Sequence, residues 1–171
     1  MNAAEAVEIL RQTPGTLRSL LSGLSEPWLR VGSRDDWGPY EVVAHLVEGE
    51  RTDWVPRART IVEHGTARTF EPFDREPPGG GAGMDDLLAE LAALREASVA
   101  ALAGLPLDDL SLRGRHPDLG EVTLGQLVAT WAVHDLSHLA QVSEVLARRW
   151  REEIGPWRAY LPVVDREPLR D

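Results

Sequence analysis

Apolar residues recur at helical spacing through almost the whole chain, and this pattern constrains the fold more than any other feature of the sequence. Leu17 and Leu24, for example, are separated by two helical turns and fall on one face. No segment shows the alternation typical of strands, and no internal repeat is visible. The periodic segments are expected at residues 3–24, 39–65, 84–105 and 123–150. Four long helices joined by loops predict an all-α four-helix bundle.

Prolines and polar caps indicate where these helices begin or are disturbed. Pro14 follows Thr13, so either the first helix kinks there or Thr13 caps a second, short helix. Pro56 is expected to kink the second helix or to remove one of its backbone hydrogen bonds. Thr123 and Gln126 have the spacing of a capping box, which predicts the start of the last helix.

The connections between the predicted helices are long. Residues 66–83 are rich in proline and glycine, and residues 105–122 form a second link without a clear strand period. Links of this length are uncommon between helices and often cover a functional site. We therefore predict one domain over residues 1–171, with long crossover loops and an irregular C-terminal tail that packs on the bundle.

Composition excludes several classes of function. The chain has no cysteine, so a metal site would have to use His, Asp, Glu, backbone or water. The net charge is −10 without a basic stripe, which argues against nucleic-acid binding. There is no apolar run of membrane-spanning length, and the N-terminal residues lack the pattern of a secretory signal. The sequence thus predicts a cytoplasmic protein that binds neither nucleic acid nor membrane.

His134 and His138 are four residues apart in the last predicted helix, so both imidazoles project from one face. Trp131 and Gln141 share that otherwise apolar face. Burial of two imidazoles is unfavourable unless they are paired, and a metal ion would pair them. Alone, the pattern is weak, because two half-buried histidines bonded to neighbours would look the same. The glutamate of the HExxH metalloprotease motif is missing.

His45 is the third candidate ligand, because it lies among apolar residues in the middle of the second predicted helix. Gly49, one turn later, would leave space beside it. Three nitrogen ligands from two helices would leave an open coordination position, as catalytic metal sites require. His64 at a helix end is better explained by the helix dipole, and His116 is expected to face solvent in a loop.

Two stretches together resemble the DinB-like superfamily of four-helix-bundle metalloenzymes: WGPYEVVAHLVEGE in the second helix and TLGQLVATWAVHDLSHLAQV in the last. The flanking pieces LRSLLSGLSEPWL and GPWRAYL extend the resemblance over nearly the whole chain. The resemblance implies a divalent metal bound by His45, His134 and His138, and frequent homodimers. It also implies a low-molecular-weight thiol as cofactor or co-substrate in some relatives. Three imidazoles without a thiolate suit zinc, nickel, iron or copper, and we predict zinc or nickel.

Helical spacing indicates roles for further residues around the three histidines, because it places Glu48 one turn from His45 and Gln141 one turn from His138. Glu48 could accept a proton or orient a bound ligand, or could be an ion-paired surface residue. Gln141 could bond substrate or support His138. Other residues have the following expected places: Trp131 in the core; Asp135 off the ligand face; Phe70, Phe73 and Asp74 near the mouth of the site; Arg51, Arg57 and Arg59 in surface ion pairs or at a substrate carboxylate.

The sequence therefore predicts a metal-dependent enzyme acting on a small-molecule substrate, either a thiol-dependent S-transferase or a hydrolase. One alternative is a non-catalytic helical binding protein whose metal is structural. Another is a metal-free bundle in which the three histidines are satisfied by hydrogen bonds inside the core. Fold alone does not decide among these, because one fold hosts many functions.

Overall fold

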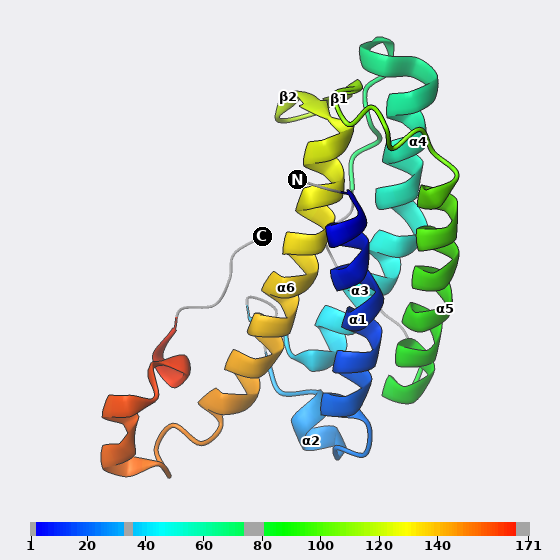
Figure 1. Cartoon of the computed structure of the whole chain (residues 1–171). Coiled ribbons are helices and arrows are strands. Elements are labelled where there is room, and N and C mark those ends of the chain that lie inside the picture. The colour runs from blue at the N-terminus through cyan, green and yellow to red at the C-terminus, as the bar shows by residue number, and fades with distance from the viewer. Residues whose placement is uncertain (1–2, 33–35, 74–80, 167–171) are drawn as a thin grey trace.

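The computed structural model describes residues 3–32, 36–73 and 81–166, and these form a helical bundle (Figure 1). Its helices are α1 (Ala3–Leu21), α2 (Glu26–Leu29), α3 (Pro39–Thr52), α4 (Trp54–His64), α5 (Met84–Ala103) and α6 (Leu124–Arg148). The predicted all-α four-helix bundle is confirmed, with α3 and α4 together forming its second rod. None of the helices in the described ranges is both long and apolar enough to cross a membrane.

The order of helices around the bundle explains why one connection is long. α1 packs against α5 and α6, and α3 packs against α5. The colours of Figure 1 show that α3, α4 and α5 run in one direction, whereas α1 and α6 run in the opposite direction. Because α4 and α5 are parallel, the chain between them must return along the length of the bundle. The predicted crossover loop is confirmed, although residues 74–80 lie outside the described ranges.

Helix α1 continues through Pro14, so the alternative of a second helix capped by Thr13 is wrong. The Thr13 hydroxyl instead donates to the carbonyl of Ile9 at 3.3 Å, within the same helix. Proline has no N–H, so the carbonyl of Leu10 loses its helical donor. Nη1 of Arg95 from α5 donates to that carbonyl at 2.7 Å. A side chain from a neighbouring helix thus replaces the backbone hydrogen bond that Pro14 removes.

The second predicted helix is divided in two, which corrects the expectation of one helix over residues 39–65. The break lies at Asp53, whose φ of −108° and ψ of −70° are distorted from ideal helical values but stay in the right-handed helical region. Pro56 lies one turn after Thr52 and cannot donate to its carbonyl, so the helix is weakest at this turn. The amide of Asp53 still bonds the carbonyl of Gly49 at 3.0 Å. The carbonyl of Asp53 accepts from Arg57 N at 3.0 Å, so α4 follows α3 directly.

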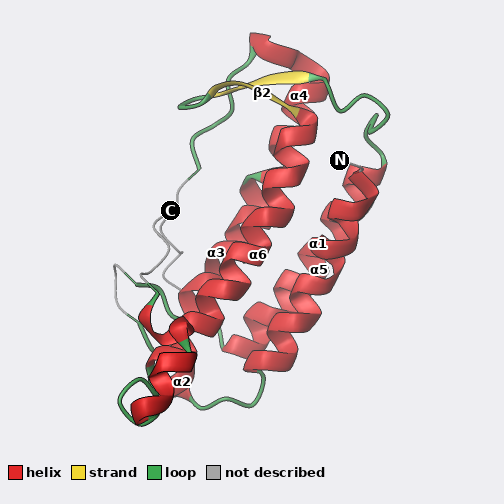
Figure 2. Cartoon of the chain, turned by 60° about the vertical axis from the view of Figure 1, so that its left-hand side comes forward, coloured by secondary structure: helices red, strands yellow, loops and turns green. Residues whose placement is uncertain are grey.

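A β-hairpin lies in the link between α5 and α6, where the sequence pattern had indicated no strand. Strand β1 (Arg113–His116) pairs antiparallel with β2 (Gly120–Thr123). Gly120 takes φ +76°, a conformation that glycine adopts readily at the end of a three-residue hairpin loop. A β-carbon on Gly114 would lie 2.6 Å from Cγ1 of Ile61, so the hairpin packs closely on α4 (Figure 2). The hairpin therefore covers one end of the bundle.

The start of α6 and the tail follow the sequence prediction. Gln126 N donates to Thr123 Oγ1 at 3.1 Å, and Thr123 N donates to Gln126 Oε1 at 2.8 Å, which confirms the capping box. After α6 the chain forms two short 3-10 helices, η2 (Gly155–Tyr160) and η3 (Pro162–Asp165). Val164 is buried and η3 packs against α6.

The apolar core consists of two clusters with a polar layer between them. One cluster includes Leu10, Ile61, Leu102 and Trp131, and the other includes Leu17, Leu46, Leu88 and Val142. Between these levels each rod contributes buried polar side chains. They are Thr13 from α1, His45 and Glu50 from α3, Arg95 from α5, and Asp135 and His138 from α6. A bundle interior of this kind is where metal sites are usually built.

Candidate metal centre

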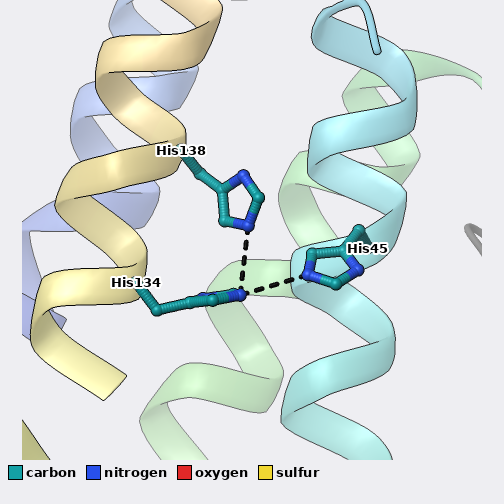
Figure 3. Close-up of side chains that lie close together, drawn as sticks. All are labelled: His45, His134 and His138. Carbon is teal, nitrogen blue, oxygen red and sulfur yellow. Dashed lines mark hydrogen bonds between the residues drawn. The ribbon is translucent and has the colours of Figure 1, made fainter. Parts of the chain in front are cut away.

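Three histidines from two helices meet in the polar layer. His45 projects from α3, and His134 and His138 project from successive turns of α6 (Figure 3). Nε2 of His134 lies 3.1 Å from Nε2 of His45 and 3.1 Å from Nε2 of His138. One nitrogen from each ring lies within 4.8 Å of the other two. The fold thus brings together residues that are 89 positions apart in the sequence.

The spacing and the charge state of these nitrogens fit a bound transition metal. Ligand nitrogens about 2.1 Å from a tetrahedral zinc ion are about 3.4 Å apart, close to the separations seen here. Burial, together with the neighbouring charges of His138, His45 and Arg95, lowers the pKa of His134 to about 2. The imidazole is therefore neutral at physiological pH, and a neutral imidazole is the form that binds metal. Nitrogen donors without carboxylates suit zinc or nickel better than magnesium or calcium.

Gln141 fixes the tautomer of His138. Its Oε1 lies 2.8 Å from Nδ1 of His138, and a carbonyl oxygen can only accept, so Nδ1 carries the proton. The lone pair of His138 is then on Nε2, which faces His134. This is the usual way in which a second residue orients a metal ligand. Nδ1 of His134 is buried and has no such partner among the described residues.

Aromatic rings surround the three histidines. Trp37 and Phe73 flank His45, with ring centroids 5.0 and 5.4 Å away. The ring of Trp54 meets His134 edge-on at 5.1 Å. A β-carbon at Gly49 would lie 3.2 Å from Nε1 of Trp54, so the space beside this glycine is used by the indole. These rings lower the local polarity and so strengthen electrostatic interactions at the site.

A cavity of about 270 Å³ adjoins two of the histidines. This volume is near the lower end of small-molecule sites. The lining residues are His45, Gly49, Asp53, Trp54, Arg57, Pro72, Phe73, His116, Pro117, Asp118 and His134. The lining combines apolar rings with a few polar groups, which is typical of sites that bind a small organic molecule. His138 is not in this lining and is almost fully buried.

The sequence model of the DinB superfamily matches residues 9–142, which is most of the chain. The chain belongs to the DinB superfamily. A protein of Bacillus cereus strain AH820 and one of Bacillus anthracis strain CDC 684 are each named "putative metal-dependent hydrolase". Each is 25% identical to this chain over 150 residues, covering 83% of this chain and 84% of the relative.

A solved structure has the same fold as this DinB-superfamily chain. It is YfiT from Bacillus subtilis, described as a probable metal-dependent hydrolase with an unusual four-helix bundle topology. The two superpose with a TM-score of 0.72 at 21% sequence identity, covering 86% of this chain and 87% of YfiT. The similarity supports the bundle with parallel α4 and α5.

The other residues that the sequence pointed to lie in different places. Glu48 Oε2 lies 3.6 Å from Arg51 Nη1, and Glu48 is absent from the cavity lining. Phe73 lines the cavity, whereas Phe70 is buried in the core. His116 does not simply face solvent as expected, because the hairpin brings it half-buried into the cavity wall. Asp74 lies outside the described residues.

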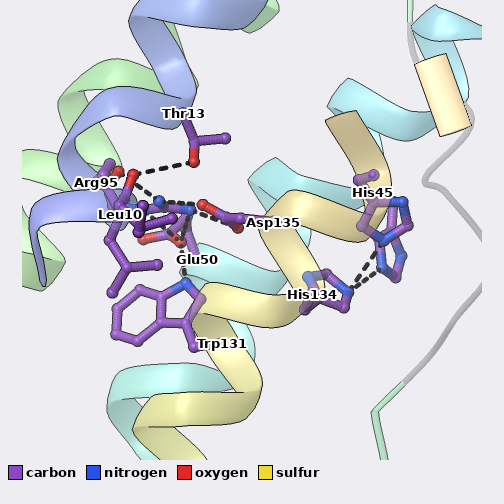
Figure 4. A network of polar contacts seen from close by, with 10 residues as sticks. Leu10, Thr13, His45, Glu50, Arg95, Trp131, His134 and Asp135 are labelled. Atoms are coloured by element: carbon purple, nitrogen blue, oxygen red, sulfur yellow. Dashed lines mark hydrogen bonds and ion pairs between the residues drawn. The ribbon is translucent and has the colours of Figure 1, made fainter. Parts of the chain in front are cut away.

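A buried ion-pair network lies beside the three-histidine cluster in this member of the DinB superfamily, and sequence reasoning missed it. Arg95 pairs with Asp135 at 2.5 Å and with Glu50 at 2.8 Å, and all three side chains are almost fully buried (Figure 4). Glu50 Oε1 also accepts from Nε1 of Trp131 at 3.0 Å. Trp131 stacks on Trp54, with ring centroids 5.6 Å apart. The network therefore supports the aromatic wall of the site.

Replacement of Gln141 tests its support of His138. Gln141→Leu removes the acceptor from the Nδ1–H of His138, and loss of such a partner usually lowers metal affinity about 10- to 100-fold. Gln141→Glu keeps an acceptor oxygen at the same distance and is the matched control, expected to bind at least as tightly as wild type. Competition with a chromophoric zinc chelator measures both affinities. Equal affinities for Gln141→Leu and wild type would contradict the assigned contact.

Proposed function

We propose that this protein is a metal-dependent hydrolase of small molecules that holds one divalent transition metal with His45, His134 and His138. The observation that carries the proposal is the convergence of three Nε2 atoms beside a cavity of about 270 Å³ that His45 and His134 line. The names of the Bacillus relatives support the same class of reaction.

The ligand set favours a catalytic metal over a structural one. Structural zinc sites use four protein ligands, whereas catalytic sites keep a position for an exchangeable ligand. No fourth His, Cys, Asp or Glu joins the cluster among the residues described. A metal in such a site lowers the pKa of the water or thiol that it binds. The aromatic rings around His45 and His134 would limit access of bulk water to that ligand.

A thiol-dependent S-transferase is the second candidate. The site has only nitrogen ligands, and a soft thiolate is a suitable additional ligand for zinc or nickel. The chain has no cysteine, so the sulfur would come from a low-molecular-weight thiol in the cavity. A hydrolase and a transferase would use the same three histidines. They differ in what occupies the cavity: water in the hydrolase, and a thiol together with its acceptor substrate in the transferase.

Metal content is the first test of this proposal. Protein purified without an affinity tag is expected to contain about one equivalent of zinc or nickel by elemental mass spectrometry. The double variant His134→Ala/His138→Ala is expected to contain almost none. His116→Ala is the matched control, because His116 lines the cavity but is outside the three-histidine cluster. An equal metal content in wild type and double variant, or none in wild type after incubation with zinc and nickel, would sink the proposal.

Assays then separate the two reactions. Ester and amide hydrolysis without added thiol supports the hydrolase. Consumption of an electrophile only when a small thiol is present supports the transferase. In both cases the double variant must lose the activity, whereas Glu48→Gln, which changes a residue outside the cavity lining, must retain it.

A further inference from the structure

Asp53 occupies the only break in the second rod of the bundle within the described residues. It ends α3 and begins α4, eight residues after His45. The side chain is 8% exposed, yet Asp53 lines the same cavity as His45 and His134. A carboxyl group buried at a helix break is unfavourable unless it has a role or a partner. Because Asp53 follows His45 and Gly49 at four-residue intervals, it lies on the same side of the rod as these two cavity residues.

Arg57 holds the Asp53 carboxyl group in place. Its Nε lies 2.6 Å from Oδ1 of Asp53, one turn along α4, and both side chains are largely buried. Arg57 is fixed in turn from the other side, where its guanidinium lies over the ring of Phe70 at 5.4 Å. Because the guanidinium is already paired, it is poorly placed to bind a substrate anion, and its effect is to orient Asp53.

We propose that Asp53 is the acid–base residue of this site, accepting and returning the proton of the ligand that reacts in the cavity, with Arg57 as its positioning residue. This rests on the proposed metal-dependent function. In the forward step the O–H or S–H bond of the ligand breaks, the proton goes to a carboxylate oxygen of Asp53, and the electron pair stays on oxygen or sulfur. In the return step the same proton goes to the leaving group.

The electrostatics of Asp53 suit this role. Burial raises the pKa of Asp53 to about 6, against the lowering effect of Arg57. General acid–base catalysis is most effective when the pKa lies near the working pH. The other charged or titratable groups that line the cavity are His45, Arg57, His116, Asp118 and His134.

Two other carboxyl groups near the site are less suitable. Glu48 pairs with Arg51 and lies outside the cavity lining. Asp118 lines the cavity but is exposed in the hairpin loop, where water solvates its charge. Asp53 alone among the described carboxylates combines burial, an ion-pair partner and a place in this cavity.

The test counts the protons released when a thiol binds to the cobalt-loaded protein. Cobalt(II) replaces the native metal, and 2-mercaptoethanol is titrated between pH 6.5 and 8 while the sulfur-to-cobalt absorption band is followed. A thiol that loses its proton to solvent binds about tenfold more tightly per pH unit, whereas one whose proton stays on the protein shows little pH dependence. The negative charge of a bound thiolate raises the pKa of Asp53 above its value of about 6 in the free protein, so the proton stays on Asp53 over part of this pH range. Wild type is therefore expected to show a clearly lower slope of log K against pH than Asp53→Asn, whose slope should be near 1.

Controls distinguish a failure of the Asp53 assignment from a failure of the proposed function. Asp118→Asn changes the other cavity aspartate and is expected to keep the wild-type slope. The visible spectrum and cobalt content must match in wild type and Asp53→Asn, which shows that the three histidines are intact. The same slope in Asp53→Asn and wild type, or no thiol band in a cobalt-loaded wild type, overturns the assignment of Asp53 alone. Failure of wild type to bind cobalt overturns the proposed function as well.

Discussion

Arg95→Met is expected to lower the free energy of unfolding by about 3–5 kcal/mol, because removal of one partner from a buried ion pair leaves an uncompensated charge. Here two carboxylates, those of Glu50 and Asp135, would remain buried without a cation. The Leu10 carbonyl would also lose the donor that compensates for Pro14. Urea denaturation at pH 7 measures the change. The total free energy of unfolding of a single domain is about 5–15 kcal/mol, so this loss is a large fraction of the stability.

Glu50, one of the two carboxyl groups of the network, provides a control variant for Arg95→Met. Burial raises the pKa of Glu50, although Arg95 and Ser98 lower it in part. For Arg95, burial lowers the pKa, but the hydrogen bonds and charges of Asp135 and Glu50 outweigh it and raise the pKa overall. Glu50→Gln keeps an oxygen that can accept from Arg95 and Trp131, and it leaves one arginine paired with one aspartate. It is expected to destabilise by less than about 1.5 kcal/mol, the net value of a typical hydrogen bond.

A result for Arg95→Met within about 1 kcal/mol of wild type would contradict the prediction, because that is the range of an exposed ion pair. The most informative comparison is then Asp135→Asn. It removes the charge that pairs with Arg95 at 2.5 Å and should lie between the other two variants in stability.

The sequence predicted the four helical rods of this fold better than the buried polar residues that lie between them. Helical periodicity is a local property, so the four rods, the capping box at Thr123 and the face shared by His134 and His138 followed from spacing alone. The prediction that His45 joins this pair came from the family resemblance, because the spacing of residues within a helix does not say which helices pack together. Arg95 was not predicted in the core because its partners lie on α3 and α6, and a single charged residue in a helix normally faces solvent.

The hairpin and Asp53 show two further reasons for missed features. Strand β1 has the sequence RGRH, which lacks the β-branched residues of typical strands, and its pairing depends on contacts with α4. The three-residue loop Pro117–Asp118–Leu119, together with Gly120 at the start of β2, did carry a turn signal that could have indicated a hairpin. Asp53 lies inside a periodic segment, and its burial in the cavity wall was not predicted because a charged residue in a helix normally faces solvent. Pro56 was expected to disturb this helix, but what the break exposes depends on the three-dimensional fold.

A divalent transition metal is expected to stabilise the wild-type protein by about 4 kcal/mol when free metal is a thousandfold above the dissociation constant, as mass action requires of a ligand that binds only the folded state. The ligands come from α3 and α6, so the complete site exists only when both helices are packed. Binding of the metal is therefore coupled to folding of the protein. Thermal unfolding of chelator-treated protein, with and without added zinc or nickel, measures the effect.

His45→Ala is the decisive variant for this coupling. It leaves His134 and His138 on one helix, a pair that can bind metal more weakly without any contact to α3. At the same metal concentration the stabilisation should fall to about 1 kcal/mol or less. The weaker site has a higher dissociation constant, so the ratio of free metal to that constant is smaller. Glu48→Gln changes a neighbouring residue on α3 outside the three-histidine cluster and should retain the wild-type stabilisation. If His45→Ala is stabilised as strongly as wild type, the metal is held by α6 alone and does not link the two helices.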